Sequence, residues 1–230
     1  MTKIELNKKI EELAKEWFYL IDRKNSNKII QNIVDLCDPY LQEYPRDTDI
    51  WIKLALAVYT TSYADDIKAT ECMNAILSYD PLNPYALIIL GYMESNSWHG
   101  ITDATFERLC SIQVDDNEVM SMIELVKAWY YSEHNNDELY RKTLESSVAL
   151  CQKHVRNCVN LGGLYIRQGR IHEGEKLQAL ALNNIKVKYI YPNNTKYFSI
   201  TDLDEFFNER IKGTSVVADD EDQKTIEIQH

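Results

Sequence analysis

Apolar side chains recur every three or four residues along most of this chain, which is the spacing of amphipathic helices. Turn-forming residues interrupt the pattern at short intervals, so consecutive helices are expected to pair as hairpins. The predicted helical segments are 3–22, 28–44, 50–62, 65–79, 85–96, 102–113, 118–133, 137–153, 156–168 and 171–183. The chain is therefore expected to be mainly α-helical.

Local signals mark several of the segment boundaries. Pro45 ends the second segment, because the residue before a proline is disfavoured in a helix. Asn83 can cap the fifth segment, and Pro84 suits its first turn, where the missing N–H costs nothing. Gly169 suits the tight turn between the last two segments, because glycine tolerates a left-handed backbone.

A leucine followed by a small residue recurs on the first helices of the predicted hairpins. Leu90-Gly91 lies 34 residues after Leu56-Ala57, and Leu161-Gly162 lies 71 residues after Leu90-Gly91. A period near 34 residues is typical of stacked helical hairpins. One hairpin cannot bury its own apolar face, so several must stack to form a core.

Residues 49–184 resemble four tetratricopeptide repeats (TPRs), and residues 1–48 resemble a capping hairpin or a degenerate repeat. The fourth repeat carries the closest match, the run from Leu161-Gly162 through Tyr165 to Gly169, and the match implies that Gly162 lies where the two helices of this hairpin touch. The third departs from the family pattern, with Leu125-Val126 where Leu-Gly is expected, so related helical-hairpin families remain alternatives for it. The resemblance implies an all-α, right-handed solenoid that binds a protein segment in its concave groove.

Aligning the first helices on their Leu-small pairs predicts which side chains line this groove. The predicted groove residues are Trp51, Leu54, Tyr85, Ile88, Tyr92, Met120, Ile123, Lys127, Tyr130, Arg156 and Asn160. Aromatic and aliphatic anchors of this kind suit an apolar peptide or helix, and we expect them to be accessible without a partner. A register error of one residue would instead make many of them core residues.

Two families of repeat proteins are useful comparisons for the groove. Only Arg156 and Asn160 resemble the carboxylate clamp by which some repeat proteins bind the acidic tails of heat-shock chaperones. The other groove positions are mostly apolar, which argues against such a clamp. Bacterial secretion chaperones of the repeat type are more similar, because they are small, acidic and hold apolar segments.

The pattern changes after Asn184. Residues 185–200 alternate around a turn at Pro192, which predicts a short β-hairpin. A helix is expected over 201–212, ending at Gly213, and the 185–213 piece is expected to cap the last repeat. Residues 214–230 include the run Asp219 to Asp222, which indicates a flexible acidic tail.

Charge narrows the classes of partner. Lys and Arg number 25 against 36 Asp and Glu, a net charge of −11, which disfavours a nucleic-acid partner. No apolar stretch is long enough to span a membrane, and the N-terminus has no signal-peptide pattern, so a cytoplasmic location is expected. A basic protein partner would be attracted by the negative field.

Residue chemistry points away from catalysis. The five cysteines are scattered and predict small buried side chains rather than disulfides or a zinc site. The five histidines are dispersed, and no nucleophile, phosphate-loop or metalloprotease motif is present. We therefore expect no cofactor, no metal and no enzymatic activity.

The main hypothesis is that the protein is an adaptor or chaperone, and the alternative is an immunity or inhibitor protein whose acidic surface covers a basic toxin.

Overall fold

The computed structural model describes residues 1–19, 26–59 and 65–185, and 80% of this part of the chain is helical. These described residues form ten α-helices and no strand. They are α1 Lys3–Tyr19, α2 Ser26–Glu43, α3 Thr48–Tyr59, α4 Asp66–Tyr79, α5 Pro84–Ser95, α6 Asp103–Ser111, α7 Asn117–Glu133, α8 Asp137–Leu150, α9 Val155–Arg167 and α10 Ile171–Ile185. The expected all-α class is confirmed for these residues.

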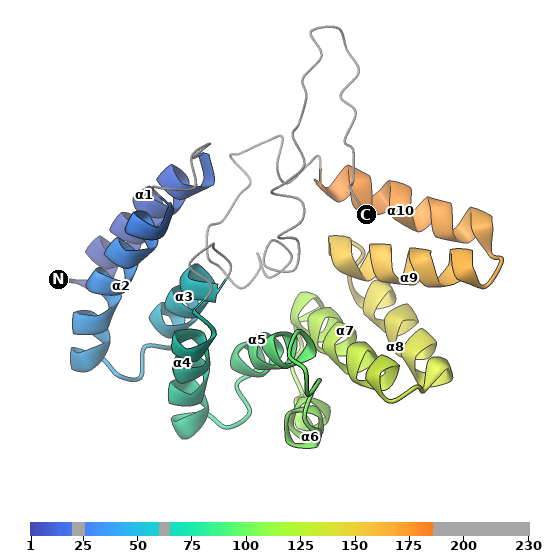
Figure 1. Ribbon diagram of the computed structural model, residues 1–230, viewed down its shortest axis with the longest axis horizontal. Coiled ribbons are helices and arrows are strands. Elements are labelled where there is room, and N and C mark those ends of the chain that lie inside the picture. Colours follow the sequence, from blue (N-terminus) through green and yellow to red (C-terminus); the bar gives the residue numbers. More distant parts are fainter. Residues whose placement is uncertain (20–25, 60–64, 186–230) are drawn as a thin grey trace, which may run out of the picture.

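The helices are arranged as five consecutive hairpins, from α1/α2 to α9/α10. Figure 1 shows the hairpins following one another along an arc, with α1 and α2 at one end and α9 and α10 at the other. Each of these helices packs on its hairpin partner, and the first helices α5 and α7 also pack on each other. This stacking gives one hydrophobic core that runs through the successive hairpins.

The predicted local boundaries are present. The Asn83 side chain accepts a hydrogen bond from the Ala86 amide at 3.0 Å, and Pro84 is the first residue of α5. Gly169 has a φ of +81° between α9 and α10, in the left-handed region that glycine tolerates. Short-range signals therefore set where these helices begin and end.

The predicted close approach at Gly162 is also present. A Cβ added at Gly162 would lie 3.0 Å from the backbone oxygen of Gly174 and 3.2 Å from the Cβ of Leu177. Both neighbours belong to α10, so Gly162 marks the place where α9 and α10 touch. This is the helix contact that a Leu-Gly pair on a TPR first helix predicts.

Four of the five cysteines are buried, as expected, and none of the five forms a disulfide. Burial raises the pKa of the Cys37 and Cys72 thiols to about 12. Cys110 is exposed, so the expectation of burial is wrong there. It lies in the last turn of α6, whose buried residues are Thr105 and Leu109, and the apolar pattern did not separate this exposed side of α6 from its buried side.

Most of the predicted C-terminal piece lies outside the described residues. Ile185, predicted to begin the β-hairpin, is the last residue of α10. The rest of the hairpin, the helix expected over 201–212 and the acidic tail over 214–230 fall outside the ranges given above. Within those ranges no helix is long and apolar enough to cross a membrane, and no cluster of three His, Cys, Asp or Glu side chains could hold a metal ion.

Candidate partner-binding surface

Four side chains from four successive first helices form a continuous row. Tyr59 of α3 lies edge-on to Tyr92 of α5, with ring centroids 5.9 Å apart at 84°. Tyr92 lies 5.9 Å from the Trp129 ring of α7 at 52°, and the guanidinium carbon of Arg156 in α9 lies 5.6 Å from the Trp129 ring centroid. We call these four residues the aromatic stripe.

The geometry of the aromatic stripe is favourable at each step. Edge-to-face and tilted ring pairs at these distances contribute about 0.5–1.5 kcal/mol beyond area burial. A guanidinium over an indole adds a cation–π attraction, which is strongest for tryptophan. The three contacts therefore link four consecutive hairpins through side chains and hold their rings in fixed positions.

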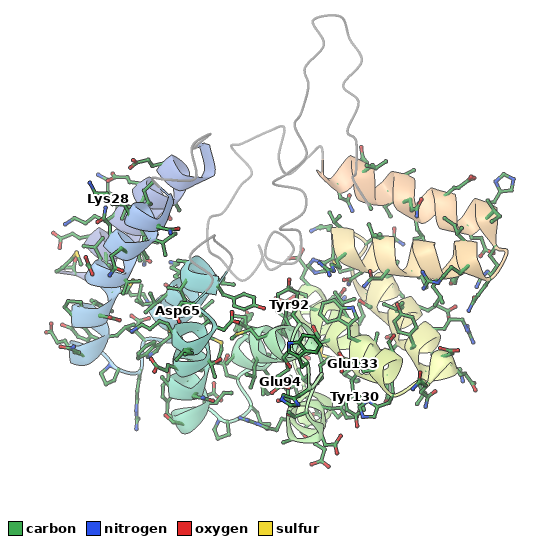
Figure 2. All side chains as sticks on the ribbon, in the orientation of Figure 1. Lys28, Asp65, Tyr92, Glu94, Tyr130 and Glu133 are labelled. Atoms are coloured by element: carbon green, nitrogen blue, oxygen red, sulfur yellow. The ribbon has the colours of Figure 1, made fainter. Side chains whose placement is uncertain are left out.

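Three of the four stripe residues are exposed enough to contact another segment. Tyr92 is 6% exposed, whereas Tyr59, Trp129 and Arg156 are only half-buried. Figure 2 places Tyr92 toward the inner side of the arc. A tryptophan, a tyrosine and an arginine that are held rigidly yet keep part of their surface exposed are the residue types enriched at binding hot spots.

Four predicted groove residues belong to the core instead, and one of them is Tyr92, which is 6% exposed and therefore not accessible as expected. Leu54, Ile88 and Ile123 are each 0% exposed, so the expectation that they are accessible without a partner is wrong. Each lies on a first helix that packs both on its hairpin partner and on a neighbouring hairpin. Fewer residues of such a helix face the concave surface than the register predicted from the sequence. The side chains of Leu54, Ile88 and Ile123 instead fill the space between helices.

Tyr130 faces a different way from the prediction. Its ring stacks on Phe106 of α6, with centroids 3.8 Å apart at 11°, and on His134 at 4.0 Å. Its hydroxyl donates to Asp103 at 2.7 Å, and this hydrogen bond is the main reason that the pKa of Tyr130 rises to about 12. Figure 2 shows Tyr130 beside α6, away from Tyr92. The neighbouring Trp129 joins the aromatic stripe in its place.

The remaining predicted residues lie at or near the surface with contacts of their own. The Trp51 indole N–H donates to the Pro45 carbonyl at 2.9 Å, which ties α3 to the preceding turn. Partial burial raises the pKa of the Tyr85 hydroxyl, and the nearby carboxylate of Asp116 adds to the rise. Lys127 forms an ion pair with Glu124 on its own helix. Met120 is half-buried against the core, and Asn160 is half-buried on α9.

Two of the predicted groove residues, Tyr92 and Arg156, thus lie in the aromatic stripe together with Tyr59 and Trp129, which the sequence did not predict. In the sequence, Trp129 is adjacent to the predicted Tyr130, in the repeat where Val126 replaces the expected glycine. Trp129 could have been found from the sequence only by shifting the predicted register of α7 by one residue. Tyr59 ends α3 and has no neighbouring motif that singles it out.

A second exposed feature lies in the loop between α5 and α6. Trp98 is 103% exposed, and the loop that carries it is tied to its neighbours by carboxylates. Glu133 accepts a hydrogen bond from the Ile101 amide at 2.7 Å, and Glu94 accepts one from the Thr102 amide at 2.9 Å. We call Trp98 and the acidic residues around its loop the acidic corner. The acidic residues are Glu94 and Glu133, which accept hydrogen bonds from the loop, and Asp103, which directly follows it.

Comparison with known proteins identifies the fold alone. No protein-family model matches the sequence, and no curated protein matches it. Two solved structures of MamA, a TPR-like helical protein, resemble the chain at 16% sequence identity. One covers 74% of this chain and 96% of MamA with a TM-score of 0.50, and the other covers 79% and 96% with a TM-score of 0.49. The first likeness supports a TPR-like helical fold.

Proposed function

We propose that this protein is a non-enzymatic interaction module, an adaptor or chaperone, that binds a protein segment along the aromatic stripe. The observation that carries the proposal is the continuity of Tyr59, Tyr92, Trp129 and Arg156 across four hairpins. Interface hot spots are enriched in tryptophan, tyrosine and arginine that are fixed before binding. A TPR-like fold presents such side chains from successive first helices.

The chemistry of the stripe describes its partner. Three aromatic rings favour apolar or aromatic side chains, and Arg156 at one end favours a carboxylate or a carbonyl group. An extended or helical segment with several apolar side chains and an acidic group at one end fits this arrangement. We propose the cytoplasm as the location of this binding.

A second candidate function is supported by the acidic corner. Trp98 is fully exposed on a loop held by Glu94 and Glu133, and the chain has a net charge of −11. A lysine or arginine of a basic partner could lie over the exposed indole while the surrounding carboxylates attract it. This arrangement suits an immunity or inhibitor protein that covers a basic toxin.

Affinity capture with matched tryptophan variants separates the two functions. The full-length wild type, Trp129→Ser and Trp98→Ser would be compared for the same captured protein, with equal amounts of folded bait. Loss of an anchoring aromatic typically weakens binding by 2 kcal/mol or more, about thirtyfold. We expect Trp129→Ser to lose the partner and Trp98→Ser to keep it. The opposite result would contradict binding at the stripe and favour the acidic corner.

A further inference from the structure

The described chain ends beside one end of the aromatic stripe. The side-chain amide of Asn184, in the last turn of α10, donates to the Gln152 carbonyl at 2.7 Å. Gln152 lies in the turn that leads into α9, and Arg156 is in the first turn of α9. Figure 1 shows the end of α10 beside the beginning of α9. The last described residues of α10 therefore lie close to the start of α9, which carries Arg156.

The sequence that follows is rich in the side chains that suit the stripe. Residues 186–213 contain six aromatic residues in 28 positions, about twice the 10% aromatic content of the whole chain. They are Tyr189, Tyr191, Tyr197, Phe198, Phe206 and Phe207. The segment also contains four acidic residues, at 202, 204, 205 and 209, which could approach the Arg156 guanidinium, beside five basic residues at 186, 188, 196, 210 and 212.

The segment is long enough to follow the whole stripe. The three contacts of the stripe are each shorter than 6 Å, at 5.6, 5.9 and 5.9 Å. An extended chain advances by roughly 3.3 Å per residue, so a short part of the segment reaches from Arg156 to Tyr59. Because the segment is covalently attached, its effective concentration at the stripe is on the order of millimolar. Weak aromatic contacts then suffice for docking.

We propose that residues 186–213 dock on the aromatic stripe of the same chain and compete there with the protein partner. The competition rests on the proposed function, whereas the docking rests on the position of Asn184 and the composition of the segment. A partner that must displace the segment binds only those molecules in which the stripe is open. Its apparent affinity is therefore its intrinsic affinity multiplied by the fraction of such molecules. The segment would thus restrict the stripe to partners that bind more tightly than it does.

Hydrogen–deuterium exchange of the full-length protein tests the docking. In the wild type, backbone amides within 186–213 should exchange at least about tenfold more slowly than in Trp129→Ser, because docking orders the segment. Trp98→Ser is the matched control, since it removes the same side chain from the acidic corner, and it should keep the slow exchange. Fast exchange of these amides in the wild type would overturn the proposal.

A second variant keeps the test decisive if Trp129→Ser also loosens the helices. Arg156→Glu changes a half-buried charge at the end of the stripe and should speed exchange within 186–213 while α7 and α9 stay protected. Slow exchange that persists in both Trp129→Ser and Arg156→Glu would overturn the proposal. The segment would then pack elsewhere, as in the end cap on the last repeat that the sequence predicted.

The docking and the proposed function can fail separately. If Trp129→Ser abolishes partner capture but the wild type shows no slow exchange within 186–213, the docking is overturned and the function stands. If Trp129→Ser removes the slow exchange but not partner capture, the docking is supported and the proposed partner site is wrong. For competition, Tyr197→Ser with Phe198→Ser should strengthen partner binding by about tenfold, and unchanged binding would overturn it.

Discussion

Val126 of α7 occupies the space that a side chain at Gly91 of α5 would need. A Cβ added at Gly91 would lie 2.5 Å from the Cγ1 of Val126, closer than real contacts allow, and both residues are buried. Since α5 packs directly on α7, the glycine of one repeat accommodates the larger residue of the next. This pairing explains how the third predicted repeat can carry valine at the position where the resemblance to TPRs led us to expect glycine.

Gly91→Ala should lower the free energy of unfolding by about 1–3 kcal/mol, because the new methyl group overpacks the contact with Val126. Adding Val126→Ala should restore part of this loss by making room for the methyl group. Urea unfolding of the wild type, both single variants and the double variant gives the coupling energy, expected at about 0.5–3 kcal/mol. Purely additive effects would contradict the pairing.

Two glycines in the last described hairpin provide a matched pair of substitutions. A Cβ at Gly174 would lie 2.5 Å from the Cγ1 of Ile166 and 2.6 Å from the Gly162 oxygen, whereas one at Gly163 would meet only the end of Arg167 at 3.6 Å. Gly174→Ala should therefore lower the melting temperature. Gly163→Ala should raise stability by up to about 1 kcal/mol, because alanine favours the helix. Equal changes in stability for the two variants would contradict the close contact between α9 and α10 at Gly174.

A buried polar network joins α7, α8 and α9. The Ser121 hydroxyl donates to the Ser147 carbonyl at 2.8 Å, and the Ser147 hydroxyl donates to the Ser121 carbonyl at 2.7 Å. The side-chain amide of Asn157 donates to both hydroxyls, and all three residues are 0% exposed. Asn157 directly follows Arg156, so this network helps to orient the start of α9 at the end of the stripe.

Ser147→Ala should destabilise the protein by about 1–3 kcal/mol, because the Ser121 carbonyl and the Asn157 amide each lose a buried partner. Ser146→Ala is the matched control, since Ser146 is exposed on the same turn of α8 and should tolerate the change. Chemical denaturation of the two variants measures the difference. If both variants unfolded at the same denaturant concentration, the network would contribute nothing to stability.

Stability at low pH should depend on Asp47. Partial burial opposes ionisation of its carboxyl group, but hydrogen bonds from Lys3 and Tyr40 outweigh it and hold the pKa of Asp47 below the usual 3.8. Because the folded-state pKa is the lower one, this stabilisation is fully present above the unfolded pKa. It is lost as the pH falls from about 4 through the folded value.

Asp47→Asn removes this titration. The variant should be less stable than the wild type at neutral pH, and the difference should shrink as the pH is lowered below about 4. Thermal melts across this pH range check the expectation. A difference between the two proteins that stays constant down to pH 2 would show that the carboxylate is not responsible.

The helix boundaries could be predicted because their causes are local. Asn83 caps α5 through an amide three residues away, and Gly169 ends α9 through its own backbone conformation. The small residue at Gly162 likewise predicted a close helix contact, since the motif places it on a hairpin's inner side. Each of these features depends on neighbours in the sequence or on one adjacent helix.

The candidate site could be predicted only in part, because the first helices are apolar on nearly every side. In α5 the four consecutive residues Ala86 to Ile89 are all buried, and in α7 the buried residues include Leu125, Val126 and Ala128. Such helices touch their hairpin partner and other hairpins, so periodicity does not separate an inward face from the core. Tyr130 was therefore predicted where Trp129 lies.

The sequence by itself determined the helical class of the described residues and the order and approximate ends of the hairpins, because capping, turn chemistry and amphipathic spacing act over a few residues. Only the tertiary structure decided which side chains meet across hairpins: Tyr59 with Tyr92, Trp129 with Arg156, and Val126 with Gly91. The rotation of each helix depends on how larger and smaller side chains of neighbouring hairpins interlock. Those neighbours are distant in sequence, so the aromatic stripe exists only once the hairpins have packed.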